Sequence, residues 1–273
     1  MKAKELYPGV FSRYAAAYQR RLDEIMARGQ AQGRQRVLDL LAVQPGMRVL
    51  DLACGPATLT RRLAAQAAPD GEVVGIDLAA GMIELARQVG IPNARFEVMD
   101  IEDLEFPDAA FDAAACGHGV QFAPDLGRCL REVRRVLRPG GKFAASVPAG
   151  SPGQRPWQVV GEVVDRYLPP APVPDDQRPT RAVVGDPAAF RNAALSAGFA
   201  EARVEVISEK VRWKSSEELV SLFLSWWDCA VRMEGIGAEK RAKFVADANA
   251  ALKEAFPGEI VTDEANHVLY AIT

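Results

Sequence analysis

Residues 49–60 are the stretch that most constrains how this chain can fold. They have the sequence VLDLACGPATLT: an apolar run too short for a helix, a loop of small residues, and the start of a helical pattern. This order predicts a strand, a tight loop and a helix N-terminus. Ala53, Gly55 and Ala57 have almost no side chain, so a ligand can approach the backbone closely. The free N–H groups at the helix start can bind either a carboxylate or a phosphate.

A second predicted strand, at residues 72–77, ends in the carboxylate Asp77, about 25 residues after Asp51. An acidic residue at this position of a doubly wound fold hydrogen-bonds the two hydroxyls of a ribose, which indicates a ligand containing a nucleoside. The loop has the sequence D-x-A-C-G-x-A rather than G-x-G-x-x-G, Pro56 has no N–H to offer a pyrophosphate, and Asp51 can meet a cation. An amino acid joined to a nucleoside fits better than a dinucleotide, which disfavours a nicotinamide-dependent oxidoreductase.

Four stretches within about residues 45–147 together resemble the class I S-adenosylmethionine-dependent methyltransferases. In order, they are VLDLACGPATLT, VVGIDLAAGMIELAR, FEVMDIEDLEFPDAAFD and LREVRRVLRPGGKF. Within that family the chain is most similar to the small-molecule branch, which includes the quinone-biosynthesis (ubiquinone and menaquinone) and many natural-product methyltransferases. It departs from the family's more usual G-x-G-x-G by having alanine at positions 53 and 57. The resemblance implies S-adenosyl-L-methionine as cofactor and S-adenosyl-L-homocysteine as product.

Strands and helices alternate from residue 47 to residue 147. The predicted strands are 47–53, 72–77, 95–99, 111–116 and 141–147, and the predicted helices are 58–67, 80–89 and 125–137. Short buried strands joined through helices form a parallel sheet that binds ligands at the carboxyl ends of its strands. With two further strands, at 203–213 and 267–272, we expect an α/β fold with a Rossmann-like, doubly wound, seven-stranded sheet. The resemblance implies an antiparallel pair at the sheet edge and a helical cap.

The pattern divides the chain into five segments, for which the resemblance implies functions. We expect a helical lid at 1–44, the cofactor-binding core at 45–147, and a Pro-rich lid with a helix near 156–168 within 148–185. Residues 186–213 and 259–273 would complete the sheet, and 214–258 would form a two-helix substrate cap. Asp186 and Ser215 have the sequence context of helix N-caps, and the helix after Ser215 is expected to run past Trp226 and Trp227.

The resemblance also implies roles for residues at the loop and at the strand ends. Asp77 would accept both ribose hydroxyls, the alternative being a helix N-cap, and Asp100 with Ile101 would contact adenine, the alternative being a solvated turn. Asp51 would hold the methionyl ammonium group. The complete set of expected cofactor contacts is Tyr18, Asp51, Ala53, Cys54, Gly55, Asp77, Leu78, Met82, Asp100, Ile101 and Gly117.

Methyl transfer requires alignment of nucleophile, methyl group and sulfur, and a base where the acceptor must lose a proton. His118, after the fourth strand, and Gln121, about one helical turn further on, are the catalytic candidates. His118 is either a general base or a residue that orients a ligand or packs. The candidate acceptor contacts are Tyr14, Trp157, Trp226 and Trp227, with core packing as the alternative.

Composition limits the class of partner. The 273 residues carry a net charge of −3, which argues against a nucleic-acid substrate, and no apolar run is long enough to span a membrane. The four cysteines lack C-x-x-C spacing and there are two histidines, so neither a disulfide framework nor a metal site is indicated. We expect a cytoplasmic, metal-free monomer or homodimer acting on a small molecule. A protein that binds the cofactor without methylating, as a cyclase or regulator, remains the alternative.

Overall fold

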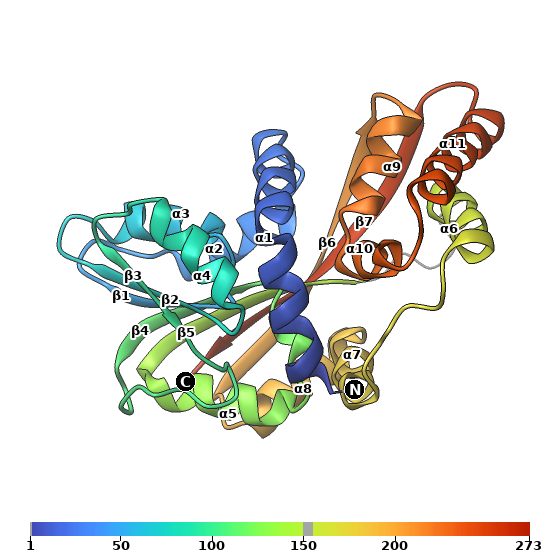
Figure 1. The fold of residues 1–273 in the computed structure, drawn as a ribbon. Coiled ribbons are helices and arrows are strands. Elements are labelled where there is room, and N and C mark those ends of the chain that lie inside the picture. Colours follow the sequence, from blue (N-terminus) through green and yellow to red (C-terminus); the bar gives the residue numbers. More distant parts are fainter. Residues whose placement is uncertain (1, 150–154) are drawn as a thin grey trace. The chain divides into compact units, whose positions relative to one another are not determined.

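The computed structural model describes residues 2–149 and 155–273 (Figure 1). The chain divides into two compact units: the first contains Met1–Ala149, Pro174–Ile207 and Ala265–Thr273, and the second contains Gly150–Val173 and Ser208–Glu264. Two long strands, β6 (Glu201–Trp213) and β7 (Ile260–Ile272), contribute residues to both units. None of the helices in the described ranges is long and apolar enough to cross a membrane.

A seven-stranded sheet has the order β3-β2-β1-β4-β5-β7-β6, which confirms the expected fold class. The first five strands are β1 (Arg48–Leu52), β2 (Glu72–Asp77), β3 (Ala94–Val98), β4 (Phe111–Gly117) and β5 (Leu137–Pro148). They pair in parallel, whereas β7 pairs antiparallel to β5. β7 begins seven residues before the strand that the sequence predicts at 267–272. The carboxyl ends of β1, β2 and β4 therefore lie at the same edge of the sheet.

Successive residues of the parallel strands face opposite layers of helices. Val49 packs with α2 (Gln32–Leu41) and α3 (Thr58–Ala67), whereas Leu50 packs with α5 (Leu126–Val136) and α8 (Pro187–Ser196). Figure 1 shows these two helical layers on either side of the sheet. The strands are buried on both faces because helices cover both, which explains their nearly continuous apolar sequences.

The N-terminal helix α1 (Ala3–Ala27) packs on α4 (Ala80–Gln88), where Ala15 of α1 meets Met82 of α4. Polar contacts anchor its first turn: the Ala3 N–H donates to Asp176, and the Lys4 ammonium pairs with Asp100 and Glu102. This helix begins at Ala3 and contains Pro8 in its second turn. Helix α1 is thereby held against the part of the chain that follows β2 and β3.

The Pro-rich segment 148–185 contains a short helix that the sequence pattern does not predict, in addition to the one expected near 156–168. After the 3₁₀ turn Asp175–Gln177, α7 (Arg178–Val184) follows with Pro179 near its start. Proline is tolerated in the first turn of a helix because the N–H it lacks would have no intrahelical partner. The next helix, α8, is capped by Asp186, whose carboxylate accepts from the Ala189 N–H, as predicted.

The second unit contains α6 (Arg155–Tyr167), α9 (Ser216–Leu224), α10 (Trp227–Glu234) and α11 (Ala238–Ala255). The Ser215 hydroxyl caps α9 by accepting from the Glu218 N–H, as predicted. The expected continuation past Trp226 is wrong: α9 ends at Leu224, and Trp226 is extended at φ −68° and ψ 141°. The Ser225 hydroxyl donates to the Leu222 carbonyl, a local hydrogen bond that competes with helix continuation. The insertion therefore has three helices rather than two.

Candidate functional site

The loop between β1 and α3 is held in a left-handed conformation at three places. Ala53, Gly55 and Ala57 have φ values of 50°, 54° and 65°. An alanine costs roughly 1–2 kcal/mol in this region, so the loop keeps its shape at the expense of stability. A Cβ built on Gly55 would meet no atom within 4 Å, which leaves room for a ligand against this stretch of backbone. The Cys54 side chain is directed away, into the apolar cluster beneath α4.

Asp77, at the end of β2, holds this loop through its carboxylate. The Gly55 N–H donates to Oδ2 at 3.0 Å and the Ala79 N–H donates to Oδ1 at 2.9 Å. The alternative role for Asp77 was the N-cap of the helix that follows, but the N-cap of α4 is Ala79. Each oxygen keeps a lone pair for a second donor. Burial raises the pKa of the Asp77 carboxyl group. The next residue, Leu78, is 37% exposed, which is unusual for a large apolar side chain.

Asp51 is a fully buried carboxylate with only one side-chain partner. The Thr60 hydroxyl donates to Oδ2 at 2.6 Å, while Oδ1 has no hydrogen-bond partner. Desolvation raises the pKa of Asp51 from 3.8 to about 7, since the hydrogen bond from Thr60 offsets only part of the cost of burying the charge. A cation placed at Oδ1 would favour the ionised form.

Asp100 follows β3 at the start of a turn, where the Asp103 N–H donates to its carbonyl, and its carboxylate forms an ion pair. The Lys4 ammonium lies 2.6 Å from Oδ2, and Oδ1 accepts from the Glu102 N–H at 2.9 Å. Ile101 is partly buried against the core beside α5. Met82 is buried between α1 and α4, where it serves as packing. Sequence reasoning missed Lys4 because the contact joins residues almost 100 positions apart.

Gly117, the last residue of β4, permits close packing against α3. A Cβ at this position would lie 2.1 Å from Leu59 Cδ1, so any side chain would displace Leu59. His118 follows with φ 65°, and its Nε2 lies 2.8 Å from Asn266 Oδ1. Burial, with the nearby positive charge of Arg34, lowers the pKa of His118 well below its usual value. His118 is therefore neutral at pH 7 and is a weak base.

The two candidate tyrosines lie on α1. The Tyr18 hydroxyl accepts from Arg34 Nη2 at 3.3 Å, and its ring makes an edge contact with Phe11. Tyr14 lies one turn earlier and is partly buried. Arg34 was missed because it lies in an Arg- and Gln-rich stretch that resembles a solvated surface. Its spacing to Val37 and Leu38, three and four positions on, places it on the buried face of α2.

Four buried polar atoms near the carboxyl edge of the sheet have no hydrogen-bond partner. They are Asp51 Oδ1, Thr58 Oγ1 at the start of α3, Gln121 Oε1 after β4, and Ser146 Oγ on β5. Ser146 pairs in register with Gly117. Buried polar atoms normally have partners, so a group of four without one indicates a polar ligand at this edge. Thr58 and Ser146 were not among the residues predicted from sequence.

Three of the predicted acceptor contacts lie in the second unit. The Trp157 indole N–H donates to Glu264 at 2.9 Å, and the Trp157 ring lies 4.9 Å from that of Trp226. Trp226 also contacts Phe223 at 5.0 Å. The rings of Trp157, Phe223 and Trp226 belong to the apolar cluster of this unit. Trp157 and Trp226 are nevertheless partly exposed. Trp227, the first residue of α10, is also partly exposed.

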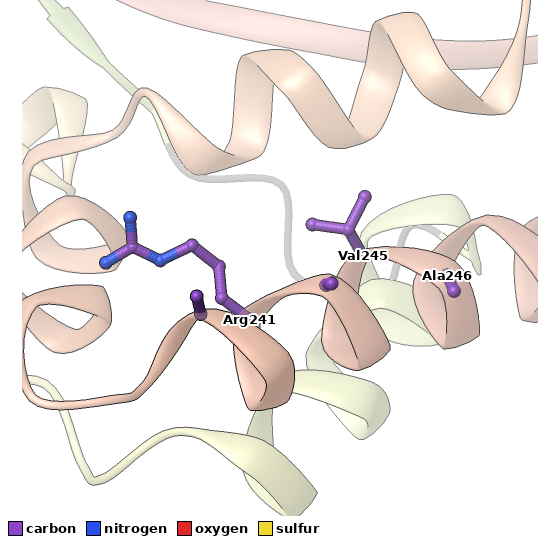
Figure 2. A pocket seen from close by; sticks show the side chains of 5 residues that line it. Arg241, Val245 and Ala246 are labelled. Carbon is purple, nitrogen blue, oxygen red and sulfur yellow. The ribbon is translucent and has the colours of Figure 1, made fainter.

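Figure 2 shows a hollow on α11 in the second unit. It is lined by Ala238, Arg241, Ala242, Val245 and Ala246, none of them a predicted site residue. Arg241 donates to the Met233 carbonyl at 2.8 Å, so its guanidinium serves the local fold. Among the described residues no cluster of three or more histidine, cysteine or acidic side chains is arranged to hold a metal ion.

Comparison with known proteins gives the class. Residues 49–141 match a family model described as a methyltransferase domain. The chain is 31% identical over 165 residues to a demethylmenaquinone methyltransferase of Listeria welshimeri, covering 59% of this chain and 70% of that protein. It is 30% identical over 228 residues to the nocamycin O-methyltransferase of Saccharothrix syringae, covering 78% and 80%. The crystal structure of the [4+2]-cyclase SpnF matches with a TM-score of 0.53 at 22% identity, over 90% of this chain and 82% of that one, and shows the fold alone.

The chain belongs to the class I S-adenosylmethionine-dependent methyltransferases and is related to the quinone methyltransferases. It is an enzyme that uses S-adenosylmethionine as its cofactor. The carboxyl edge of the sheet fits this cofactor chemically. Asp77 offers acceptors for hydroxyl groups, Asp51 offers an unpartnered oxygen to an ammonium group, and the loop at Gly55 leaves its backbone accessible.

Proposed function

We propose that the protein transfers a methyl group from S-adenosylmethionine to a small acceptor with an aromatic, quinone-like or related natural-product ring. The observation that carries the cofactor half of this proposal is the buried Asp51 carboxylate, whose Oδ1 lacks a partner at the carboxyl edge of the sheet. The acceptor half is supported by the partly exposed aromatic cluster of the second unit and by the names of the relatives, which act on a menaquinone precursor and on a natural product.

For the cofactor, we propose a set of contacts along three strand ends. Asp77 accepts the two ribose hydroxyls with the lone pairs that its backbone contacts leave free, and Leu78 covers the adjacent ring. Asp51 holds the ammonium group through Oδ1. Asp100 and Ile101 contact adenine. The ion pair with Lys4 holds the Asp100 carboxylate in position for this contact.

For the chemical step, we propose that the protein contributes alignment and exclusion of water. When bound, the cofactor supplies an electrophilic methyl group on its sulfonium. His118 is held by Asn266 and remains neutral, so it orients the acceptor by a hydrogen bond instead of taking its proton. The buried Gln121 offers an unpartnered amide oxygen as a second polar contact. An acceptor whose own hydroxyl or carbon acid ionises near neutral pH fits a site with such a weak base.

For the acceptor, we propose that Trp157, Trp226 and Trp227 contact its ring, with Tyr14 as a further contact from α1. Aromatic pairs contribute roughly 0.5–1.5 kcal/mol beyond the area they bury, which is enough to select a ring over an aliphatic chain.

The four cysteines are all buried and free, which supports the cytoplasm as the place of action.

The test is an isotope-transfer screen with the purified protein. S-Adenosylmethionine labelled with ¹³C in its methyl group is incubated with hydroquinones of naphthalene and benzene type, phenols, enolic dicarbonyls and aliphatic amines. Products are analysed by mass spectrometry and S-adenosylhomocysteine release is quantified. Label in a hydroquinone, phenol or enol supports the proposal, whereas label only in an aliphatic amine contradicts the acceptor class. Tight binding of S-adenosylhomocysteine without any labelled product would favour the non-methylating alternative.

A further inference from the structure

A buried glutamine, Gln177, joins three segments of the first unit that lie far apart in the sequence. It belongs to the 3₁₀ turn Asp175–Gln177, and its exposed fraction is 0%. Its Nε2 donates to the Gln121 carbonyl at 2.5 Å, and its Oε1 accepts from the hydroxyl of Tyr7 on α1. Because a backbone carbonyl can only accept, these partners fix which way the Gln177 amide faces. A buried amide stabilises a fold little more than an apolar side chain does, so its value lies in fixing the geometry of its partners.

Gln177 and α1 together hold the 3₁₀ turn Val120–Phe122, which follows β4. Hydrogen-bond geometry in such a turn is poorer than in an α-helix, so contacts from outside help to set its position. The Phe122 ring lies 4.9 Å from the ring of Tyr7 and 5.2 Å from that of Phe11, both on α1. The turn is therefore held by ring contacts at its end and by the Gln177 hydrogen bond at its middle residue.

This turn lies beside the loop between β1 and α3. A Cβ built on Gly119, just before the turn, would lie 2.5 Å from Ala53 Cβ in that loop. In the middle of the turn, Gln121 is only 9% exposed, and among the described residues its Oε1 has no hydrogen-bond partner. A buried oxygen of this kind costs stability until a donor reaches it. The residue whose carbonyl Gln177 fixes is thus also the residue whose side-chain oxygen lacks a donor.

We propose that Gln177 is a positioning residue for the acceptor, because it fixes the backbone from which Gln121 presents its side-chain oxygen to a hydrogen-bond donor on the acceptor. The inference rests on the proposed contact between Gln121 and the acceptor, and it narrows the acceptor to ring compounds that carry an O–H or N–H donor. Without Gln177, the Gln121 carbonyl would be buried without its donor, and the turn would move to find another. The Gln121 side chain would move with it, so that selection for the donor would weaken.

The experiment compares two aromatic probes of similar size that differ in one hydrogen-bond donor. Binding of 1-naphthol, which donates through its hydroxyl, and of 1-fluoronaphthalene, which cannot donate, is measured by equilibrium dialysis with saturating S-adenosylhomocysteine. The parent should bind 1-naphthol about 3- to 10-fold more tightly, which is the effect of one hydrogen bond. Gln177→Met keeps the length of the side chain and removes both hydrogen bonds, so it should reduce this preference to less than about twofold.

Three further variants show whether Gln177 acts through Gln121. Adding Gln177→Met to Gln121→Met should cause no further loss of preference, because residues that act through one chain of contacts are not additive. Thr180→Val removes a hydrogen bond from the same segment to the Pro124 carbonyl, and it should leave the preference unchanged. Tyr7→Phe removes the donor to Gln177 and should lower the preference in part, and it replaces Gln177→Met if that variant does not fold.

Affinity for S-adenosylhomocysteine should stay within about threefold of the parent's in the Gln177, Thr180 and Tyr7 variants, because these residues are not among the proposed cofactor contacts. An unchanged preference in Gln177→Met, together with a lower melting temperature, would show that Gln177 only supports the fold. A parent that binds both probes equally, or neither, would show that Gln121 receives no donor from an aromatic ligand and would overturn the inference. Methyl transfer in the isotope screen would stand in either case, so the two proposals fail separately.

Discussion

Replacing Asp51 with asparagine should make the ligand-free protein more stable and the cofactor complex weaker. Asp51 is fully buried, and burial moves its pKa from 3.8 to about 7. At about 1.4 kcal/mol per pKa unit, this corresponds to about 4 kcal/mol of stability lost when the carboxylate ionises. The asparagine amide cannot ionise but leaves a donor short of a partner, at about 1–3 kcal/mol. The net gain for Asp51→Asn at pH 8 is therefore about 1–3 kcal/mol.

The sign of the pH dependence follows from the direction of the pKa change. Between pH 3.8 and about 7 the folded protein keeps the Asp51 proton while the unfolded chain has released it. The parent's stability therefore falls as pH rises through this window and is constant above it, as far as Asp51 is concerned. The stability difference between Asp51→Asn and the parent should grow from pH 4 to 7 and then level off, with the parent equal or more stable at the acid end.

Thermal unfolding from pH 5 to pH 8.5 measures this difference. At about 2–4 °C per kcal/mol, Asp51→Asn should melt at least about 2 °C above the parent at pH 8. The control Asp70→Asn makes the same change at an exposed turn and should show no such trend. In calorimetry, the Asp51→Asn variant should bind S-adenosylhomocysteine about 10- to 100-fold more weakly. A stability difference that does not vary with pH would refute the account of Asp51 as a buried, poorly partnered acid.

Three other substitutions test separate parts of the site. Asp77→Ala should weaken S-adenosylhomocysteine binding at least about tenfold and cost about 1–3 kcal/mol of stability, since two backbone N–H groups lose their acceptor; calorimetric affinity within about threefold of the parent would exclude the ribose role. Ala53→Gly should raise the melting temperature by about 2–4 °C, because glycine relieves the cost of φ 50°, and a clear decrease would show that the loop is not strained there. Trp226→Ala should raise the acceptor KM without changing cofactor affinity. The control Trp213→Ala removes a buried ring and should cost about 3–5 kcal/mol of stability. If Trp226→Ala lowers the melting temperature and leaves the acceptor KM unchanged, Trp226 is part of the core.

The elements of the parallel sheet were predictable because their signals are local. Strand β2 (Glu72–Asp77) and helix α3 (Thr58–Ala67) have the predicted bounds, since each is a short periodic run ended by a loop of small or polar residues. The break of α9 at Ser225 was not predictable, because the helical apolar spacing continues through it. Likewise α7 was hidden by the prolines around it, although Pro179 is placed where a helix tolerates it.

The placement of the candidate site residues was predictable only where it follows from a position on a strand. The carboxylates at 51, 77 and 100 fall at strand ends, so topology alone brings them to one edge. Their partners could not be predicted, because Lys4 reaches Asp100 and Asn266 reaches His118 from distant parts of the chain. The burial of Arg34 had a signal in its helical spacing, but the surrounding arginines and glutamines obscured it.

A crystal structure of the protein with S-adenosylhomocysteine tests the central claim most directly. The account predicts that the ribose hydroxyls contact the Asp77 carboxylate and that the ammonium group lies at Asp51 Oδ1. The backbone of the loop at Gly55 should pass beside the ligand. A ligand bound away from the carboxyl edge of the sheet, or one whose ribose does not contact Asp77, would contradict the account.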